Sequence, residues 1–74
     1  MEYAERIEKR YGDRFRAVEE LVLAANPDIN SVTKGYARTS IAQWFVGVMT
    51  AEEFVRSWGV DKQALSDATN GRPS

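Results

Sequence analysis

Residues 50–70 read Thr-Ala-Glu-Glu-Phe-Val-Arg-Ser-Trp-Gly-Val-Asp-Lys-Gln-Ala-Leu-Ser-Asp-Ala-Thr-Asn, and this stretch decides the fold. Thr50 and Glu53 have the spacing of a capping box, in which each side chain binds the backbone amide of the other residue. A helix is therefore expected to follow Thr50 and to run to Trp58. Gly59 is expected to stop it, because glycine accepts the left-handed conformation found just after many helices.

A second helix is expected directly after this turn. Asp61 is a good N-cap residue, so the helix should run from Lys62 to about Asn70. Asn70-Gly71 predicts a left-handed terminus, and residues 71–74 predict a loose tail. The end of the chain thus predicts two short helices joined by a tight turn.

The N-terminal segment, residues 1–25, carries an apolar stripe at helical spacing. Its members are Ala4, Ile7, Tyr11, Phe15, Val18, Val22 and Ala25, with Leu21 beside them. Gly12-Asp13 interrupts the stripe, so one long helix and two abutting helices are both acceptable, and Asp13 is a candidate cap for the second. Pro27 ends the segment, because the residue before a proline is disfavoured in helical geometry.

The middle of the chain predicts a short helical turn and then a separate helix. Asn30 or Ser31 is expected to open the turn, and Gly35 to close it. A helix capped at residues 39–40 should then carry residues 41–49, of which only two are not apolar. Such a helix belongs in the centre of the fold, mostly buried.

These elements predict an all-α fold: one domain, residues 1–74, built as a compact bundle of four to five short helices. A chain of 74 residues has room for one core. The expected core residues are Trp44, Phe45, Phe54, Trp58 and Leu65.

The composition excludes several kinds of chemistry. The chain contains no cysteine and no histidine, which rules out disulfides, thiolate–zinc sites, a cysteine nucleophile and a histidine base. Glu52 and Glu53 are adjacent and so point in different directions, and no glycine-rich phosphate loop is present. We therefore expect a protein that is not an enzyme and that uses no cofactor or metal.

No signal peptide and no apolar run of membrane-spanning length is found. The absence of cysteine in so small a chain favours a reducing compartment. These features predict a cytoplasmic protein of a bacterium or phage, without a membrane contact.

Residues 51–70 resemble the helix-turn-helix of phage-repressor and Cro-like DNA-binding regulators. With Gly59 as the turn glycine, apolar residues occupy the positions where the motif's two helices pack: Phe54, Trp58, Val60, Leu65 and Ala68. The chain departs from the pattern at Val55, where the family usually has a small residue. It also has fewer basic residues than is usual, and its motif is not followed by further helices.

The resemblance implies which residues would meet DNA. The second helix would enter the major groove and read bases with Lys62, Gln63, Ser66 and Asn70. Thr50 and Arg56 would contact the phosphate backbone from the first helix. Asp67 does not fit this arrangement, because phosphates repel a carboxylate.

The charges favour DNA only slightly. The net charge is −1, whereas nucleic-acid binders usually carry a basic excess. Residues 1–30 have a net charge of −2 and residues 31–74 of +1, so the C-terminal half is expected to provide the DNA face.

A second window, residues 35–44, resembles the turn and recognition helix of the same regulators. Its upstream helix does not fit, because Asn30 and Lys34 stand at positions that should be apolar.

The preferred function is a small transcription regulator that binds double-stranded DNA, expected to act as a dimer. The alternative is a helical adaptor or phage-type inhibitor that docks on a protein target through an exposed apolar patch. In that case residues 51–70 are two ordinary helices, and Trp44, Phe45 and Met49 are core residues or line a partner pocket. The charges of residues 5–20 are a solvated helix face, or else the N-terminal stripe forms a homodimer seam.

The surroundings of the last helix discriminate between these functions. Lys62, Gln63 and Asn70 exposed beside a positive patch favour DNA. The same residues ringed by acidic side chains, Glu52, Glu53 and Asp67, favour a protein partner.

Overall fold

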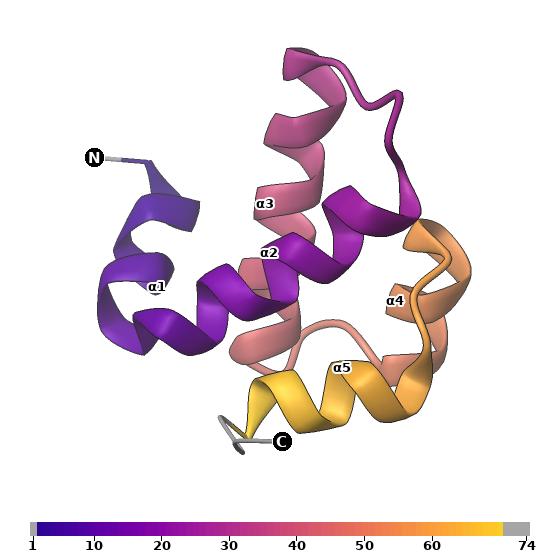
Figure 1. Cartoon of the computed structure of the whole chain (residues 1–74). Coiled ribbons are helices and arrows are strands. Elements are labelled where there is room, and N and C mark those ends of the chain that lie inside the picture. Colours follow the sequence, from indigo (N-terminus) through magenta and orange to yellow (C-terminus); the bar gives the residue numbers. More distant parts are fainter. Residues whose placement is uncertain (1, 71–74) are drawn as a thin grey trace.

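Five helices form the part of the chain that the computed structural model describes, residues 2–70 (Figure 1). They are α1 (Tyr3–Tyr11), α2 (Asp13–Ala25), α3 (Ser31–Phe45), α4 (Ala51–Trp58) and α5 (Lys62–Thr69). No residue of this range is in a strand. The predicted all-α bundle is confirmed. None of these helices has the length and apolar character needed to cross a bilayer.

Gly12 divides the N-terminal segment into two helices. Its φ of 61° is left-handed, and its amide donates to the Glu8 carbonyl at the end of α1. The chain then turns into α2, so the two-helix alternative is the correct one. Asp13 is the first residue of α2 and not its cap; its carboxylate instead accepts a hydrogen bond from Arg16 at 2.6 Å.

α3 is one continuous helix, which corrects the prediction of two elements. Asn30 caps it by accepting a hydrogen bond from the Thr33 amide at 2.8 Å. Asn30 is one of the two residues predicted to open a helix here. The helix then passes through Gly35, which does not close it, and no new helix begins at residues 39–40. A glycine inside a helix costs about 1 kcal/mol relative to alanine, and the burial of Ala37 and Ile41 further along α3 offsets that cost.

α3 ends at Phe45, earlier than predicted. Gly47 takes a φ of 85°, and the amides of Val48 and Met49 both donate to the Gln43 carbonyl. Val48 is therefore exposed, and the expected buried helix over residues 41–49 is wrong in its second half. The second window resembling a helix-turn-helix is also wrong, because its proposed turn lies inside α3.

The core is centred on α2, which packs against both α3 and α5 (Figure 1). Phe54 and Leu65 are buried as predicted, whereas Trp44, Phe45 and Trp58 are only partly buried. The buried residues are Ala4, Ile7, Phe15, Val18, Val22, Ala37, Ile41, Ala42, Phe54, Val60 and Leu65.

The N-terminal stripe lies within this core and not at the surface. Its residues in α1 and α2 are buried against the rest of the same chain, except that Tyr11 and the neighbouring Leu21 are partly buried and Ala25 at its end is exposed. The stripe is therefore not available as a homodimer seam.

The local signals of α4 and α5 are confirmed. The Glu53 amide donates to the Thr50 hydroxyl at 3.2 Å, and the Thr50 amide donates to the Glu53 carboxylate at 3.1 Å, which completes the capping box. Gly59 is left-handed, with φ 67° and ψ 28°. Asp61 caps α5 by accepting from the Ala64 amide at 2.9 Å.

α5 ends near the predicted residue. Asn70, its C-cap, has right-handed helical angles, φ −80° and ψ −7°, so the predicted left-handed terminus depends on Gly71. Gly71 and the expected loose tail, residues 71–74, lie outside the described residues.

Candidate functional site

The hairpin of α4 and α5 is joined by three residues, Gly59 to Asp61. Phe54, Val60 and Leu65 are buried between this hairpin and the rest of the fold, and Val55 and Ala68 pack against the same core from partly buried positions. The interpretation as a DNA-reading motif and the interpretation as two plain helices share this packing. They differ in what they expect of the exposed side of α5.

That exposed side carries the predicted base-reading residues. Lys62, Gln63, Ser66 and Asn70 are all exposed. Two of them are held by acidic side chains: Lys62 Nζ lies 2.9 Å from Glu52 Oε1, and Gln63 Nε2 donates to Asp67 Oδ1 at 3.1 Å. The hydrogen bond from Lys62 lowers the pKa of Glu52, so this carboxylate is ionised at neutral pH.

The predicted backbone contacts, Thr50 and Arg56, are also exposed. The Thr50 side chain is engaged in the capping box. Arg56 forms no ion pair within residues 2–70. Of these two residues, Arg56 is therefore free to contact a partner.

The charge of the hairpin is acidic. Residues 50–70 carry two basic residues, Arg56 and Lys62, against four acidic ones, which gives a net charge of −2. The positive lean expected for the C-terminal half depends on Lys34 and Arg38 of α3 and on Arg72, which is outside the described residues. The hairpin itself does not contribute to this positive charge.

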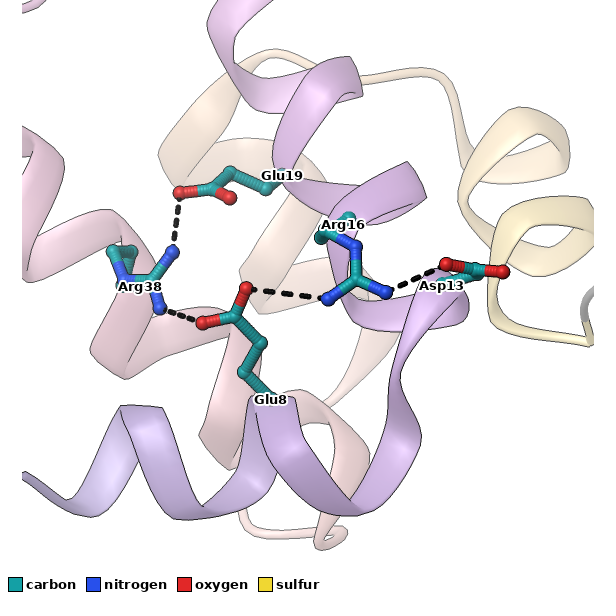
Figure 2. Close-up of polar contacts among 5 residues, drawn as sticks. All are labelled: Glu8, Asp13, Arg16, Glu19 and Arg38. Atoms are coloured by element: carbon teal, nitrogen blue, oxygen red, sulfur yellow. Dashed lines mark hydrogen bonds and ion pairs between the residues drawn. The ribbon is translucent and has the colours of Figure 1, made fainter. Parts of the chain in front are cut away.

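Arg38 belongs to an ion-pair network that joins α1, α2 and α3 (Figure 2). Its guanidinium binds Glu8 of α1 and Glu19 of α2, the latter at 2.7 Å. Glu8 also lies 3.6 Å from Arg16, which pairs with Asp13 at 2.6 Å.

The network holds its arginines in the charged form. Partial burial alone lowers the pKa of Arg38, but the hydrogen bonds to Glu19 and Glu8 outweigh it and leave the pKa above its ordinary value. The pKa of Arg16 is raised chiefly by its hydrogen bond to Asp13. The network binds three helices to one another. Its charged groups pair with each other and are not free to bind a partner.

A hollow of about 310 Å³ lies where the end of α3, the start of α4 and the outer side of α5 meet. It is lined by Trp44, Ala51, Lys62, Leu65, Ser66, Thr69 and Asn70. Three of the four predicted base-reading residues thus line a concave site. The sequence suggested a partner pocket at Trp44 as one alternative, but gave no sign that α5 forms its other wall.

The apolar wall of this hollow is fixed in place. The Trp44 indole donates to the Thr69 hydroxyl at 2.7 Å, and that hydroxyl donates to the Leu65 carbonyl at 2.7 Å. The Trp44 ring also packs against Phe54, with 6.2 Å between ring centroids. Sequence reasoning missed Thr69, because its partner Trp44 lies 25 residues away in the chain.

Within residues 2–70 no group of three acidic side chains is arranged to hold a metal ion. Comparison of the chain with protein families, with curated proteins and with solved structures found no match. The hollow and the charges around it are therefore the basis for a functional assignment.

Proposed function

We propose that this chain is a small protein-binding adaptor, and that the hollow between α3, α4 and α5 receives an apolar side chain of its partner. The observation that carries the proposal is the arrangement of the hollow: a fixed apolar wall, Trp44 and Leu65, beside the polar groups of Lys62, Ser66 and Asn70.

The size and rigidity of the hollow support this function. A volume of about 310 Å³ is at the small end of the range for ligand sites, which is about 300–1,000 Å³. It suits one large side chain better than a whole small molecule. Because Trp44 is already held by Thr69, binding immobilises little of this wall, and tryptophan is among the residues that contribute most at protein interfaces.

The polar edge supports a peptide as the occupant. Ser66 and Asn70 offer hydroxyl and amide groups that can bind the backbone of a peptide beside the inserted side chain. Val46 and Val48, in the connection that follows Trp44 and leads to α4, are exposed and extend the apolar surface of this end of the molecule.

The charges favour a protein over DNA. Glu52 and Asp67 hold Lys62 and Gln63, the two groups best suited to read bases, and the hairpin has a net charge of −2. To contact DNA, these side chains would have to leave their partners, and four carboxylates would approach the phosphates.

Binding of double-stranded DNA by α5 is the second candidate, as a transcription regulator. Its specific support is the geometry of the connection: two eight-residue helices, a left-handed Gly59 between them and an exposed outer side on the second helix. This arrangement is the one that the resemblance to phage-repressor regulators implies.

A peptide selection tests the proposal. A library of displayed random peptides is selected on the protein, and each selected peptide is then labelled with a fluorescent dye and titrated by fluorescence anisotropy. We expect peptides that share one large apolar residue. Ser66→Trp, which fills the hollow, should weaken their binding at least about tenfold, a loss of about 1.4 kcal/mol.

The matched control is Ser57→Trp, at an exposed serine of α4 that does not line the hollow. Peptides that bind both tryptophan variants as well as the original chain contradict the proposal. In parallel, a mixed-sequence DNA duplex is titrated at low and moderate salt with the Lys62→Ala/Gln63→Ala variant alongside. Salt-dependent binding that this variant loses would establish the second candidate in place of the first.

A further inference from the structure

Only some of the basic residues in the described part of the chain form ion pairs. Ion pairs within residues 2–70 engage Arg16, Arg38 and Lys62. The other basic residues of this range form none: Arg6, Lys9, Arg10, Arg14, Lys34 and Arg56. The first four of them fall within the short stretch of residues 6–14, on α1 and the first turn of α2, and we call these four the basic corner.

Arg6 and Arg10 lie one turn apart on one side of α1, and Lys9 lies on the adjacent side, where it lines a hollow with Glu5, Glu8, Arg16 and Arg38. Each residue of the basic corner is exposed, whereas Ala4 and Ile7 of α1 are buried. The left-handed turn at Gly12 then brings the start of α2 back beside the end of α1 (Figure 1).

Two of these cations lie beside the ring of Tyr11. The guanidinium carbons of Arg10 and Arg14 lie 5.9 and 5.2 Å from the centre of its ring, within the range of a cation–π interaction. The ring is itself fixed by stacking on Phe45 at 4.6 Å. Two like charges beside one ring repel each other, and an anion that bridges them relieves the repulsion.

The neighbouring carboxylates do not neutralise the basic corner. Glu8 and Asp13 are engaged by Arg16 and Arg38 in the network of Figure 2. Glu2, the N-cap residue of α1, and Glu5 also lie near the four cations in the sequence, and these six residues have a net charge of +2. The basic corner is thus opposite in sign to the α4–α5 hairpin.

We infer that the basic corner binds the phosphate backbone of a nucleic acid. Three of its four cations are arginines, whose planar fork binds phosphate oxygens in pairs. Arg6 and Arg10 lie along one side of α1 and Arg14 follows at the start of α2, a spacing that suits a polymer whose charges repeat along its length. Tyr3, 41% exposed and in step with Arg6 and Arg10 at i, i+3 and i+7, adds an aromatic ring to the same side.

This surface is separate from the peptide-binding hollow and from the helix that the second candidate places on DNA. Its contacts are to the backbone, so it is expected to bind without sequence preference and with a strong dependence on salt. The two surfaces together would let the chain hold a protein against a nucleic acid.

The test is a titration of a fluorescently labelled mixed-sequence duplex over a range of salt concentrations. Contact with up to four phosphates predicts a slope of log K against log salt of about −3 to −4. The Arg10→Gln/Arg14→Gln variant should bind roughly tenfold or more weakly at low salt, with a slope reduced by about 2.

The control compares two single variants that remove the same charge: Arg14→Gln in the basic corner and Lys34→Gln at an exposed residue of α3 that forms no ion pair within residues 2–70. We expect Lys34→Gln to lose less affinity than Arg14→Gln, because Lys34 does not meet the backbone. Equal losses in the two variants would overturn the inference, since binding would then follow net charge alone.

Other results also overturn it. Equal affinity for polyglutamate and for the duplex would show that the surface serves an acidic protein. Loss of duplex binding in Lys62→Ala/Gln63→Ala, with none in the arginine variant, would move the contact to α5. Failure to bind the duplex at low salt, by a protein shown to be folded, would also reject it. Apart from the Lys62→Ala/Gln63→Ala result, which favours the second candidate function, these outcomes do not bear on the peptide selection. The two proposals can therefore fail separately.

Discussion

The ion pairs of α1–α3 and the ion pair of α4–α5 use similar residues in different surroundings. Arg38 has a side chain only 23% exposed, and it joins carboxylates from two other helices (Figure 2). Lys62 and Glu52 are each 66% exposed and form one pair across the hairpin. The comparison shows that the contribution of a charge is decided by its burial and by the number of its partners, neither of which is visible in a count of charges.

This difference also means that the net charge of each half of the sequence does not show where the cations without ion pairs lie. Arg38 adds to the positive lean of residues 31–74, yet it neutralises Glu8 and Glu19 in the N-terminal part of the fold. The basic residues that form no ion pair lie mainly on α1 and α2, whose half of the sequence is net acidic. We therefore expect the two regions to respond differently to substitution.

The largest effect is expected for Arg38→Met. This change leaves Glu8 and Glu19, partly buried, without their shared cation, and should lower the free energy of unfolding by about 2 kcal/mol. Urea unfolding at neutral pH, followed by circular dichroism, measures it. The matched change in the hairpin, Lys62→Met, should alter stability by no more than about 0.5 kcal/mol, because exposed pairs contribute little. Equal losses would show that the network does not bind the helices together.

A pair of glycines gives the next largest difference. Gly59 is left-handed and Gly35 is helical, and an added Cβ meets no atom within 4 Å at either position. Backbone conformation alone should then decide the result. We expect Gly59→Ala to lower stability by about 1–2 kcal/mol and Gly35→Ala to raise it by up to about 1 kcal/mol.

Thermal unfolding of the two glycine variants measures both changes, and their opposite signs are the diagnostic feature. A destabilising Gly35→Ala would contradict the continuity of α3 at that residue.

The two tryptophans allow the hollow, which Trp44 lines, to be compared with the end of α4, where Trp58 lies. The Trp44 indole N–H donates to Thr69, whereas the buried Trp58 indole N–H has no partner within the described residues. Replacement by phenylalanine removes a satisfied donor at Trp44 and an unsatisfied one at Trp58. We expect Trp44→Phe to cost about 1 kcal/mol more than Trp58→Phe in urea unfolding. The reverse order would mean that lost packing at Trp58 outweighs its unpaired N–H.

The features that could be predicted from sequence are those whose determinants lie within a few residues. The capping box of Thr50 and Glu53, the stop at Gly59 and the cap at Asp61 each depend on contacts three or four residues apart, and each is confirmed. The all-α class followed from the spacing of apolar residues.

The features that were missed depend on distant contacts. α3 continues through Gly35 because residues beyond it pack on α1 and α2, which a local propensity does not include. Arg38 meets Glu8 and Glu19 across 30 and 19 residues, and Trp44 meets Thr69 across 25. The hollow therefore could not be assembled from sequence, although Lys62, Ser66 and Asn70 were each expected on the exposed side of α5.

The smallest expected effect is the pH dependence of the hairpin cap. The hydrogen bond from the Thr50 amide, with a second from its hydroxyl, lowers the pKa of Glu53 below its ordinary value. Because the folded pKa is lower than the unfolded one, ionised Glu53 stabilises the fold above the unfolded pKa of about 4.3. That contribution is lost as the pH falls through the folded pKa.

Glu53→Gln isolates this charge, because glutamine can still accept the hydrogen bond from Thr50. We expect the variant to unfold at a slightly lower temperature than the original chain at pH 7, and the difference to vanish near pH 3. Glu20→Gln, at an exposed glutamate of α2 that forms no ion pair within residues 2–70, is the control and should show no such convergence. A difference for Glu53→Gln that persists undiminished at pH 3 would mean that the cap depends on shape alone, and that the charge of Glu53 contributes nothing to the hairpin.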